Sequence, residues 1–178
     1  PLDLTSEQND YAQFLPALST FYALFIGRQR RGLQIGEPYV DPARIPSVLG
    51  GMEGMNWLDS KGLWRYKWSL HSAGHASLDL QKDMFREEQY RDRDRNYSWL
   101  LGDSGGFQIG KGVWEGDWKD PNCPKAQQKR DSVLRWMDAY MDYGMILDIP
   151  AWIARSPAGA KATGISTYQE AVKATRIN

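Results

Sequence analysis

The feature that most constrains the fold is a strand–helix–strand pattern in the second half of the chain. The segment NYSWLLG, residues 96–102, is short and apolar, and it ends at Asp103. The next segment, from Lys125 to Tyr143, carries an apolar stripe at helical spacing, formed by Ala126, Val133, Met137, Tyr140 and Met141. A second apolar segment, MILDIPAW, follows at residues 145–152. Two strands joined by a helix predict parallel β/α construction, in which active groups sit at the carboxyl ends of the strands.

Weaker signals elsewhere extend this pattern. Apolar residues at helical intervals predict a helix over residues 11–25, which Pro16 is expected to kink or interrupt. The proline- and glycine-rich residues 36–56 are expected to form a long irregular connection. Three further elements are predicted, namely a strand over residues 64–70, a helix over residues 76–90 with Leu78, Leu80, Met84 and Phe85 inward, and a last helix over residues 167–175.

Charge and cysteine content limit the function classes. The chain has 22 lysine and arginine residues against 22 aspartate and glutamate residues, so a basic field over the whole molecule is absent, although a local patch stays open. The one cysteine, Cys123, excludes an internal disulfide framework and a cysteine-rich zinc site, and it fits a reducing, cytoplasmic compartment. His71 and His75 have no third ligand at suitable spacing, so we do not expect a metal site. No run approaches the ~20 apolar residues that a membrane span needs.

The segment GDSGGFQ, residues 102–108, matches two unrelated signatures. Its first five residues are similar to the nucleophile segment of chymotrypsin-like serine proteases. That enzyme needs a histidine and an aspartate on a double β-barrel well before the serine. His75 precedes Ser104 by too few residues to build such a barrel, and helices are predicted on both sides of the motif. The protease interpretation is therefore disfavoured.

The longer segment LLGDSGGFQIG resembles the tRNA-guanine transglycosylase (queuine tRNA-ribosyltransferase) family. The later segment YGMILDIP, residues 143–150, resembles that family's next landmark, a strand that ends in an aspartate. The resemblance covers roughly residues 97–150. The first ninety residues do not resemble the tRNA enzymes, and this divergence is similar to that of relatives that insert 7-deazaguanines into DNA. The resemblance implies a TIM-type (β/α) barrel and exchange of guanine for a 7-deazaguanine derivative in DNA or tRNA.

The resemblance also implies roles for two carboxylates. Asp103 would be the catalytic group that handles protons on the leaving and entering base. Asp148 would accept hydrogen bonds from the N1–H and the exocyclic amine of guanine, an edge that adenine lacks. The structural alternative for either residue alone is that an aspartate at the end of a strand caps the next turn or helix. Two such aspartates, on different strands, favour a shared crevice.

The remaining residues of the motif would bind the substrate. By the resemblance, Ser104 would hydrogen-bond to it, and Gly105 and Gly106 would let a flat base approach the backbone closely. Phe107 would stack on the ring, and Gln108 would offer a donor and an acceptor to the base edge. The partners implied are a nucleic acid and a free purine or 7-deazapurine base, with no membrane. A homo-oligomer or a complementing subunit stays open.

The chain departs from the family pattern in three ways. No aspartate after Asp148 matches the family's nucleophile. The family's zinc ligands are absent, so no cofactor is expected within this chain. A complete (β/α)₈ barrel needs about 250 residues, and the 178 residues here supply about three strand–helix units. We therefore expect one domain over residues 1–178 that is the N-terminal portion of an incomplete barrel. The alternatives are an inactive base-binding or assembly module on the same fold, and a carbohydrate-active barrel in which Asp103 and Asp148 form the acid/base pair.

Overall fold

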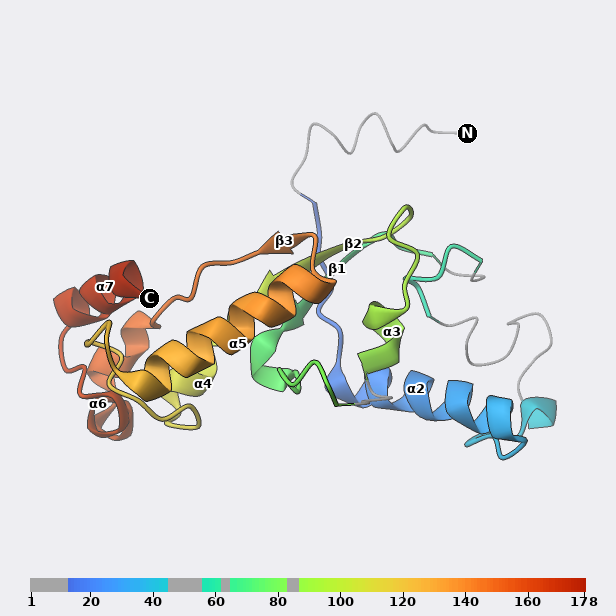
Figure 1. The fold of residues 1–178 in the computed structure, drawn as a ribbon, viewed down its shortest axis with the longest axis horizontal. Coiled ribbons are helices and arrows are strands. Elements are labelled where there is room, and N and C mark those ends of the chain that lie inside the picture. Colours follow the sequence, from blue (N-terminus) through green and yellow to red (C-terminus); the bar gives the residue numbers. More distant parts are fainter. Residues whose placement is uncertain (1–12, 45–55, 62–64, 83–86) are drawn as a thin grey trace. The chain divides into compact units, whose positions relative to one another are not determined.

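The computed structural model of the chain describes residues 13–44, 56–61, 65–82 and 87–178 (Figure 1). The chain divides into two compact units, and each is described by itself. The first unit comprises Pro1–Leu70 and Met84–Leu100, and the second comprises His71–Asp83 and Leu101–Asn178. The whole of GDSGGFQ and Asp148 therefore belong to the second unit.

The main helix of the first unit is α2, Thr20–Ile35 (Figure 1). It ends where Gly36 adopts a left-handed conformation with φ 77°, which glycine tolerates because it lacks a Cβ. The buried side chain of Gln29 then holds the following backbone, since its amide exchanges hydrogen bonds of 2.9 and 2.8 Å with the carbonyl and N–H of Val40. A 3₁₀ turn, η2 (Pro42–Arg44), follows. The short helix α3, Glu88–Arg91, lies against α2 through an ion pair between Arg31 and Glu88.

The predicted helix over residues 11–25 starts later than expected. Residues 13–19 are not helical, and residues 11 and 12 lie outside the described ranges. The backbone N–H of Leu70 donates to the carbonyl of Pro16 at 3.0 Å, and the N–H of Leu18 donates to the carbonyl of Leu70 at 2.7 Å. Pro16 thus belongs to a short extended segment in which Ala17 forms a parallel bridge with Leu70. Pro16 marks a break before the helix, because extended pairing replaces the helical hydrogen bonds there.

The burial of Tyr22 on α2 predicts how the stability of the protein changes at high pH. Its ring stacks on Trp57 at 5.2 Å between centroids, and burial raises its pKa to about 12. In the unfolded chain a tyrosine ionises near pH 10. The unfolded state therefore loses this proton between about pH 10 and pH 12 while the folded state keeps it, so stability falls with rising pH in that window.

We expect Tyr22→Phe to remove that part of the pH dependence. Urea unfolding at several pH values from 9 to 12 would show a shallower loss of stability in the variant than in the unmodified chain. Tyr97, whose pKa burial also raises, keeps its contribution in both proteins. Identical pH profiles for the two proteins would contradict the assignment.

Among the described residues, three strands form a small parallel sheet in the order β1-β2-β3. They are β1 (Trp68–Ser72), β2 (Trp99–Asp103) and β3 (Tyr143–Gly144). Residues of β3 pair with β2 so that Leu101 faces Tyr143 and Gly102 faces Gly144. The N–H of Met145 then donates to the carbonyl of Gly102 at 2.8 Å, which is the last bond to this sheet edge. The predicted strand at residues 96–102 is confirmed from Trp99 to its end at Asp103, whereas residues 96–98 are not part of it.

Helix α5, Pro124–Tyr140, packs over the glycines of β2 and β3 (Figure 1). A Cβ at Gly102 would lie 2.8 Å from Met141 and 3.2 Å from Met137, and one at Gly144 would lie 2.9 Å from the Met137 sulfur. The absence of side chains on these two strand residues thus lets the apolar stripe of the helix reach the backbone. The predicted helix over residues 125–143 is confirmed, although it ends three residues earlier because Met141 is already extended.

The rest of the second unit consists of short helices around an apolar core. They are η5 (Ala73–His75), α4 (Gly106–Gly110), η7 (Ala151–Arg155), α6 (Pro157–Thr163) and α7 (Tyr168–Ile177). The fully buried side chains of this core include Trp118, Trp136, Ile109, Ile153 and Ile165. Each contributes about 1.5–3 kcal/mol of transfer free energy. Aromatic residues thus fill much of this core.

Two predicted elements are wrong in part. Of the helix expected over residues 76–90, the described residues 76–82 are not helical and only Glu88–Arg91 forms α-helix; Met84 and Phe85 lie outside the described ranges. Asp79 accepts a hydrogen bond from the N–H of Gln81 at 3.1 Å, and Leu78 has a positive φ of 59°. Such local side-chain bonds compete with the helix.

The strand expected in the segment from residue 145, ending near Asp148, is also wrong, because β3 stops at Gly144. The N–H of Ile149 donates to the hydroxyl of Thr175 on α7 at 2.8 Å instead of to a strand. Pro150 has no N–H to donate at all. Asp148 therefore lies in an irregular segment, four residues beyond the strand.

The prediction of a TIM-type (β/α) barrel, even an incomplete one, is wrong. In the described part of the chain the parallel sheet is open, has three strands and shows no sign of closure into a barrel. Closure needs strands long enough to tilt and pair around a circle, and β3 contributes two residues. The protein is a small α/β fold.

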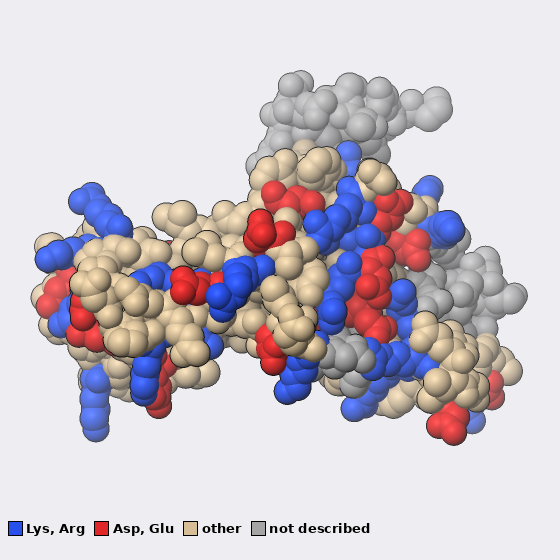
Figure 2. Space-filling model, viewed as in Figure 1, with Lys and Arg blue, Asp and Glu red and all other residues tan. Residues whose placement is uncertain are grey.

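The surface carries both signs of charge. On the face drawn in Figure 2, lysine and arginine side chains alternate with aspartate and glutamate side chains. In the first unit, Arg30 of α2 lies 3.6 Å from Asp92. Within the described residues, no helix is both long and apolar enough to cross a membrane.

Candidate functional site

The GDSGGFQ motif forms the turn between β2 and α4. Gly105 adopts a left-handed conformation with φ 82°, and α4 begins at the next residue. A Cβ at Gly105 would lie 2.5 Å from the Trp114 ring and 2.9 Å from the N–H nitrogen of Gly74. Both the conformation and the contacts therefore require glycine. The turn brings the motif's backbone directly against the loop that follows β1.

The two sequence landmarks meet at a hydrogen bond between Ser104 and Asp148. The hydroxyl of Ser104, which is fully buried, donates to the Oδ1 atom of Asp148 at 3.2 Å. Gly106 lies against the same residue, since a Cβ there would overlap the carbonyl oxygen of Asp148 and lie 2.9 Å from Oδ1. Residues 44 positions apart in the chain are thus in contact. The expectation that the two segments share one site stays a prediction, and this contact supports it.

Asp103 and Asp148 keep their carboxylates available. Asp103, at the end of β2, is half-buried, and Asp148 is exposed. Among the described residues, neither forms an ion pair. Each can therefore bind a substrate group without first breaking a salt bridge.

Gln108 presents an acceptor that the described residues do not satisfy. Its Oε1 atom is buried and has no hydrogen-bond partner there. The side-chain amide lies in the space that a Cβ at Gly74 would occupy. An unsatisfied buried acceptor costs about 1–3 kcal/mol. Because this atom is buried, a ligand would reach it only after the side chain moves, and the base-edge role of Gln108 stays a prediction.

Phe107 points away from the core, and 56% of its surface is exposed. Its ring lies 5.8 Å from that of Trp152 on η7, at an interplanar angle of 55°. The ammonium group of Lys111 lies 5.4 Å from the centre of the Phe107 ring and 5.8 Å from that of Trp152. An exposed ring of this kind can stack on a flat ligand, as predicted for Phe107.

Sequence reasoning missed three residues at this site, which are Gly74, Lys111 and Trp152. No motif or spacing connects them to the GDSGGFQ segment. Trp152 packs beside Gly110, whose added Cβ would lie 2.6 Å from its ring. The glycine at position 110, four residues after Gly106 on α4, is the single sequence signal that the helix has a close neighbour.

The histidines and the cysteine do not form a metal centre in the described part of the chain. His71 is buried, and its ring lies 6.0 Å from that of Trp136. His75 is exposed on η5. Cys123, at the start of α5, is not in a disulfide, and hydrogen bonds from the N–H groups of Ala126 and Asp117 lower the pKa of its thiol.

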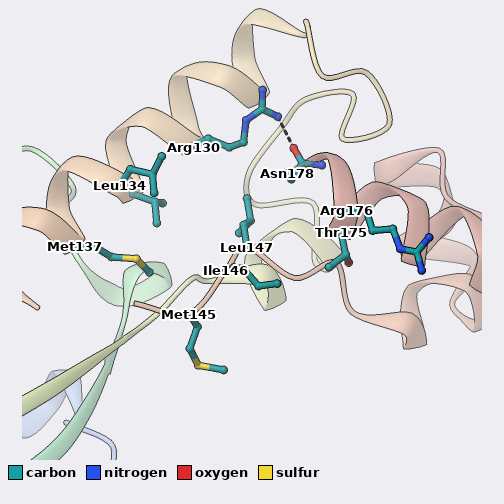
Figure 3. A pocket seen from close by; sticks show the side chains of 10 residues that line it. Arg130, Leu134, Met137, Met145, Ile146, Leu147, Thr175, Arg176 and Asn178 are labelled. Atoms are coloured by element: carbon teal, nitrogen blue, oxygen red, sulfur yellow. Dashed lines mark hydrogen bonds between the residues drawn. The ribbon is translucent and has the colours of Figure 1, made fainter. Parts of the chain in front are cut away.

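A separate pocket of about 300 Å³ lies between α5, residues 145–147 and the end of α7 (Figure 3). Its walls are mainly apolar, with Leu134, Met137 and Ile146 facing inward and Arg130 bonded to Asn178 at one end (Figure 3). No residue of GDSGGFQ lines it, and neither does Asp148. It is therefore not part of the site that the motif forms.

No protein-family model, curated protein or solved structure matches the chain. The chemistry of the site must therefore be argued from its own residues.

Proposed function

We propose that the turn after β2 binds a guanine base, and that the protein exchanges guanine for a 7-deazaguanine derivative in DNA or tRNA. The observation that carries this proposal is the contact between Ser104 and Asp148, at 3.2 Å. It joins the two segments that resemble the guanine transglycosylases. The proposal includes a cytoplasmic location, in agreement with the single Cys123.

The chemistry of the residues supports recognition of guanine. Asp148 accepts hydrogen bonds from the N1–H and the exocyclic amine of the base, and its Oδ1 is oriented by the Ser104 hydroxyl. Gln108 offers the unsatisfied buried acceptor. Adenine lacks this pair of donors and cannot form these two hydrogen bonds with the carboxylate. The arrangement therefore favours guanine over adenine.

Exchange requires two displacement steps at the sugar. In the first, a carboxylate attacks C1′ and the bond to N9 of guanine breaks, so that guanine leaves with a proton supplied by the enzyme. In the second, N9 of the incoming base attacks C1′, loses its proton and releases the carboxylate. Asp103 is the group proposed to move these protons. The residue that acts as nucleophile has no assignment in this chain.

A second candidate is a module that binds the base without exchanging it. The missing assignment of a nucleophile favours this alternative. It uses the same contacts at Ser104, Gln108 and Asp148, so binding measurements alone do not separate it from the enzyme.

The test combines base binding with base exchange. Calorimetry with the 178-residue chain should show that guanine binds at least about tenfold more tightly than adenine. Radiolabelled guanine should enter tRNA or duplex DNA, and Asp103→Ala should stop this incorporation while leaving guanine binding in place. Binding without exchange would identify the module instead of the enzyme. Failure to bind guanine, together with failure to exchange it, would overturn both.

A further inference from the structure

A cation lies over two exposed rings beside the proposed base site. Lys111 has no carboxylate partner among the described residues, and its ammonium group lies within 5.8 Å of the ring centres of Phe107 and Trp152. Trp152 is 38% exposed. An unpaired cation next to aromatic faces is suited to a ligand that has both a flat ring and a negative charge.

A hollow of about 520 Å³ lies on Trp152, between η7 and the start of α7. Its lining includes Trp152, Arg155 and Tyr168, and Tyr168 is 62% exposed. The guanidinium of Arg155 forms no ion pair with any described residue. The hollow thus combines two stacking surfaces with a second available cation.

The hydroxyl groups of the other polar residues that line the hollow, Ser166 and Thr167, already form hydrogen bonds within the protein. The Ser166 hydroxyl donates to Glu170 at 3.0 Å, and the Thr167 hydroxyl accepts from the N–H of Glu170 at 3.2 Å in the capping box of α7. The Glu170 carboxylate also accepts from the N–H groups of both residues, which lowers its pKa. No aspartate, glutamate, asparagine or glutamine lines the hollow. Its available groups, which are two aromatic rings and the Arg155 guanidinium, suit a base and a phosphate.

We propose that this hollow binds the nucleotide next to the guanosine at the base site, on a single-stranded or unpaired segment of nucleic acid. Tyr168 and Trp152 stack on the neighbouring base, while Arg155 and Lys111 contact the phosphates between the two nucleotides. Trp152 connects the sites, because its ring also contacts Phe107 of the motif. The inference rests on the proposed function, and it makes the substrate a polynucleotide and not a free nucleoside.

The test measures binding of a fluorescein-labelled single-stranded octadeoxynucleotide with one central dG, by anisotropy at several salt concentrations. Tyr168→Ala should weaken binding by about 5- to 140-fold, the range for loss of one base–aromatic stack. Arg155→Ala should reduce the slope of log K against log salt by about 0.7, which is the loss of one phosphate contact. These variants are preferred to Trp152→Ala, since Trp152 also packs against Gly110.

Two matched variants serve as controls. Tyr143→Ala removes another exposed tyrosine, on β3, and Arg176→Ala removes another exposed arginine, on α7. Both should leave oligonucleotide binding unchanged. Circular dichroism of all four variants checks that each one folds.

Guanine titrations on the same variants separate the two proposals. Oligonucleotide binding that depends on Tyr168 and Arg155, with guanine binding intact, supports the inference. Loss of guanine binding in the unmodified chain would defeat the proposed function, whatever the oligonucleotide does. An octanucleotide that does not bind, or that binds equally to Tyr168→Ala and Arg155→Ala, would overturn the inference alone. Equal weakening by the control variants would do the same.

Discussion

Replacing Gly106 with alanine is expected to abolish guanine binding and to lower the free energy of unfolding by about 1–3 kcal/mol. The new Cβ would overlap the carbonyl oxygen of Asp148 and crowd its Oδ1, which lies 2.9 Å away. Because both obstacles belong to the segment that carries the proposed base-binding carboxylate, relief of the clash must move Asp148. Denaturant unfolding and calorimetry with guanine would measure the two effects.

Gly144→Ala is the matched control for this change. Its Cβ would also meet an atom at 2.9 Å, but that atom is the sulfur of Met137, at the end of a flexible side chain. The methionine can shift at small cost, so we expect a stability loss below about 1 kcal/mol and unchanged guanine binding. If Gly106→Ala binds guanine as the unmodified chain does, the turn after β2 does not hold Asp148 in the way described.

Asp148→Asn is expected to weaken guanine binding by about 100-fold while changing the free energy of unfolding by less than about 1 kcal/mol. Asparagine keeps an oxygen that can accept the hydrogen bond from Ser104, so the local structure survives. It loses the negative charge and places an amide donor where guanine also presents donors. Titration of guanine and urea unfolding, carried out on the same preparation, would separate the two effects.

Asp138→Asn provides the comparison, because Asp138 is an exposed aspartate on α5 outside the site. It should change neither guanine affinity nor stability appreciably. A variant at position 148 that loses stability and guanine affinity to the same extent would show that Asp148 is a structural residue. The same result would remove the main support for guanine recognition.

Local signals were sufficient for several elements. The capping box of Thr167 and Glu170 starts α7, and the predicted last helix is confirmed. The apolar stripe and Pro124 define α5, and the apolar run before Asp103 defines β2. These elements could be predicted because the hydrogen bonds and side-chain periodicity that form them lie within a few residues of each other.

Two predicted elements failed for different reasons. One was prevented by a contact between residues far apart in the sequence, and the other by a local side-chain hydrogen bond that competes with the helix. The segment from residue 145 to Asp148 was predicted to be a strand, yet β3 ends at Gly144 and the N–H of Ile149 donates to Thr175, 26 residues away. Residues 76–82 read as a helix, yet Asp79 closes a turn there. The barrel was expected from the parallel β/α pattern and the resemblance, but a pattern of elements does not determine whether a sheet closes.

The sequence by itself determined β2, α5, α7 and the seven-residue turn motif, since neighbouring residues and glycine conformations specify them. Only the tertiary structure decided what this turn contacts. It brought the hydroxyl of Ser104 to Asp148, the amide of Gln108 to Gly74, and Trp152 and Lys111 to Phe107. These contacts join parts of the chain that are distant in sequence, and their formation depends on the packing of side chains and not on any local pattern.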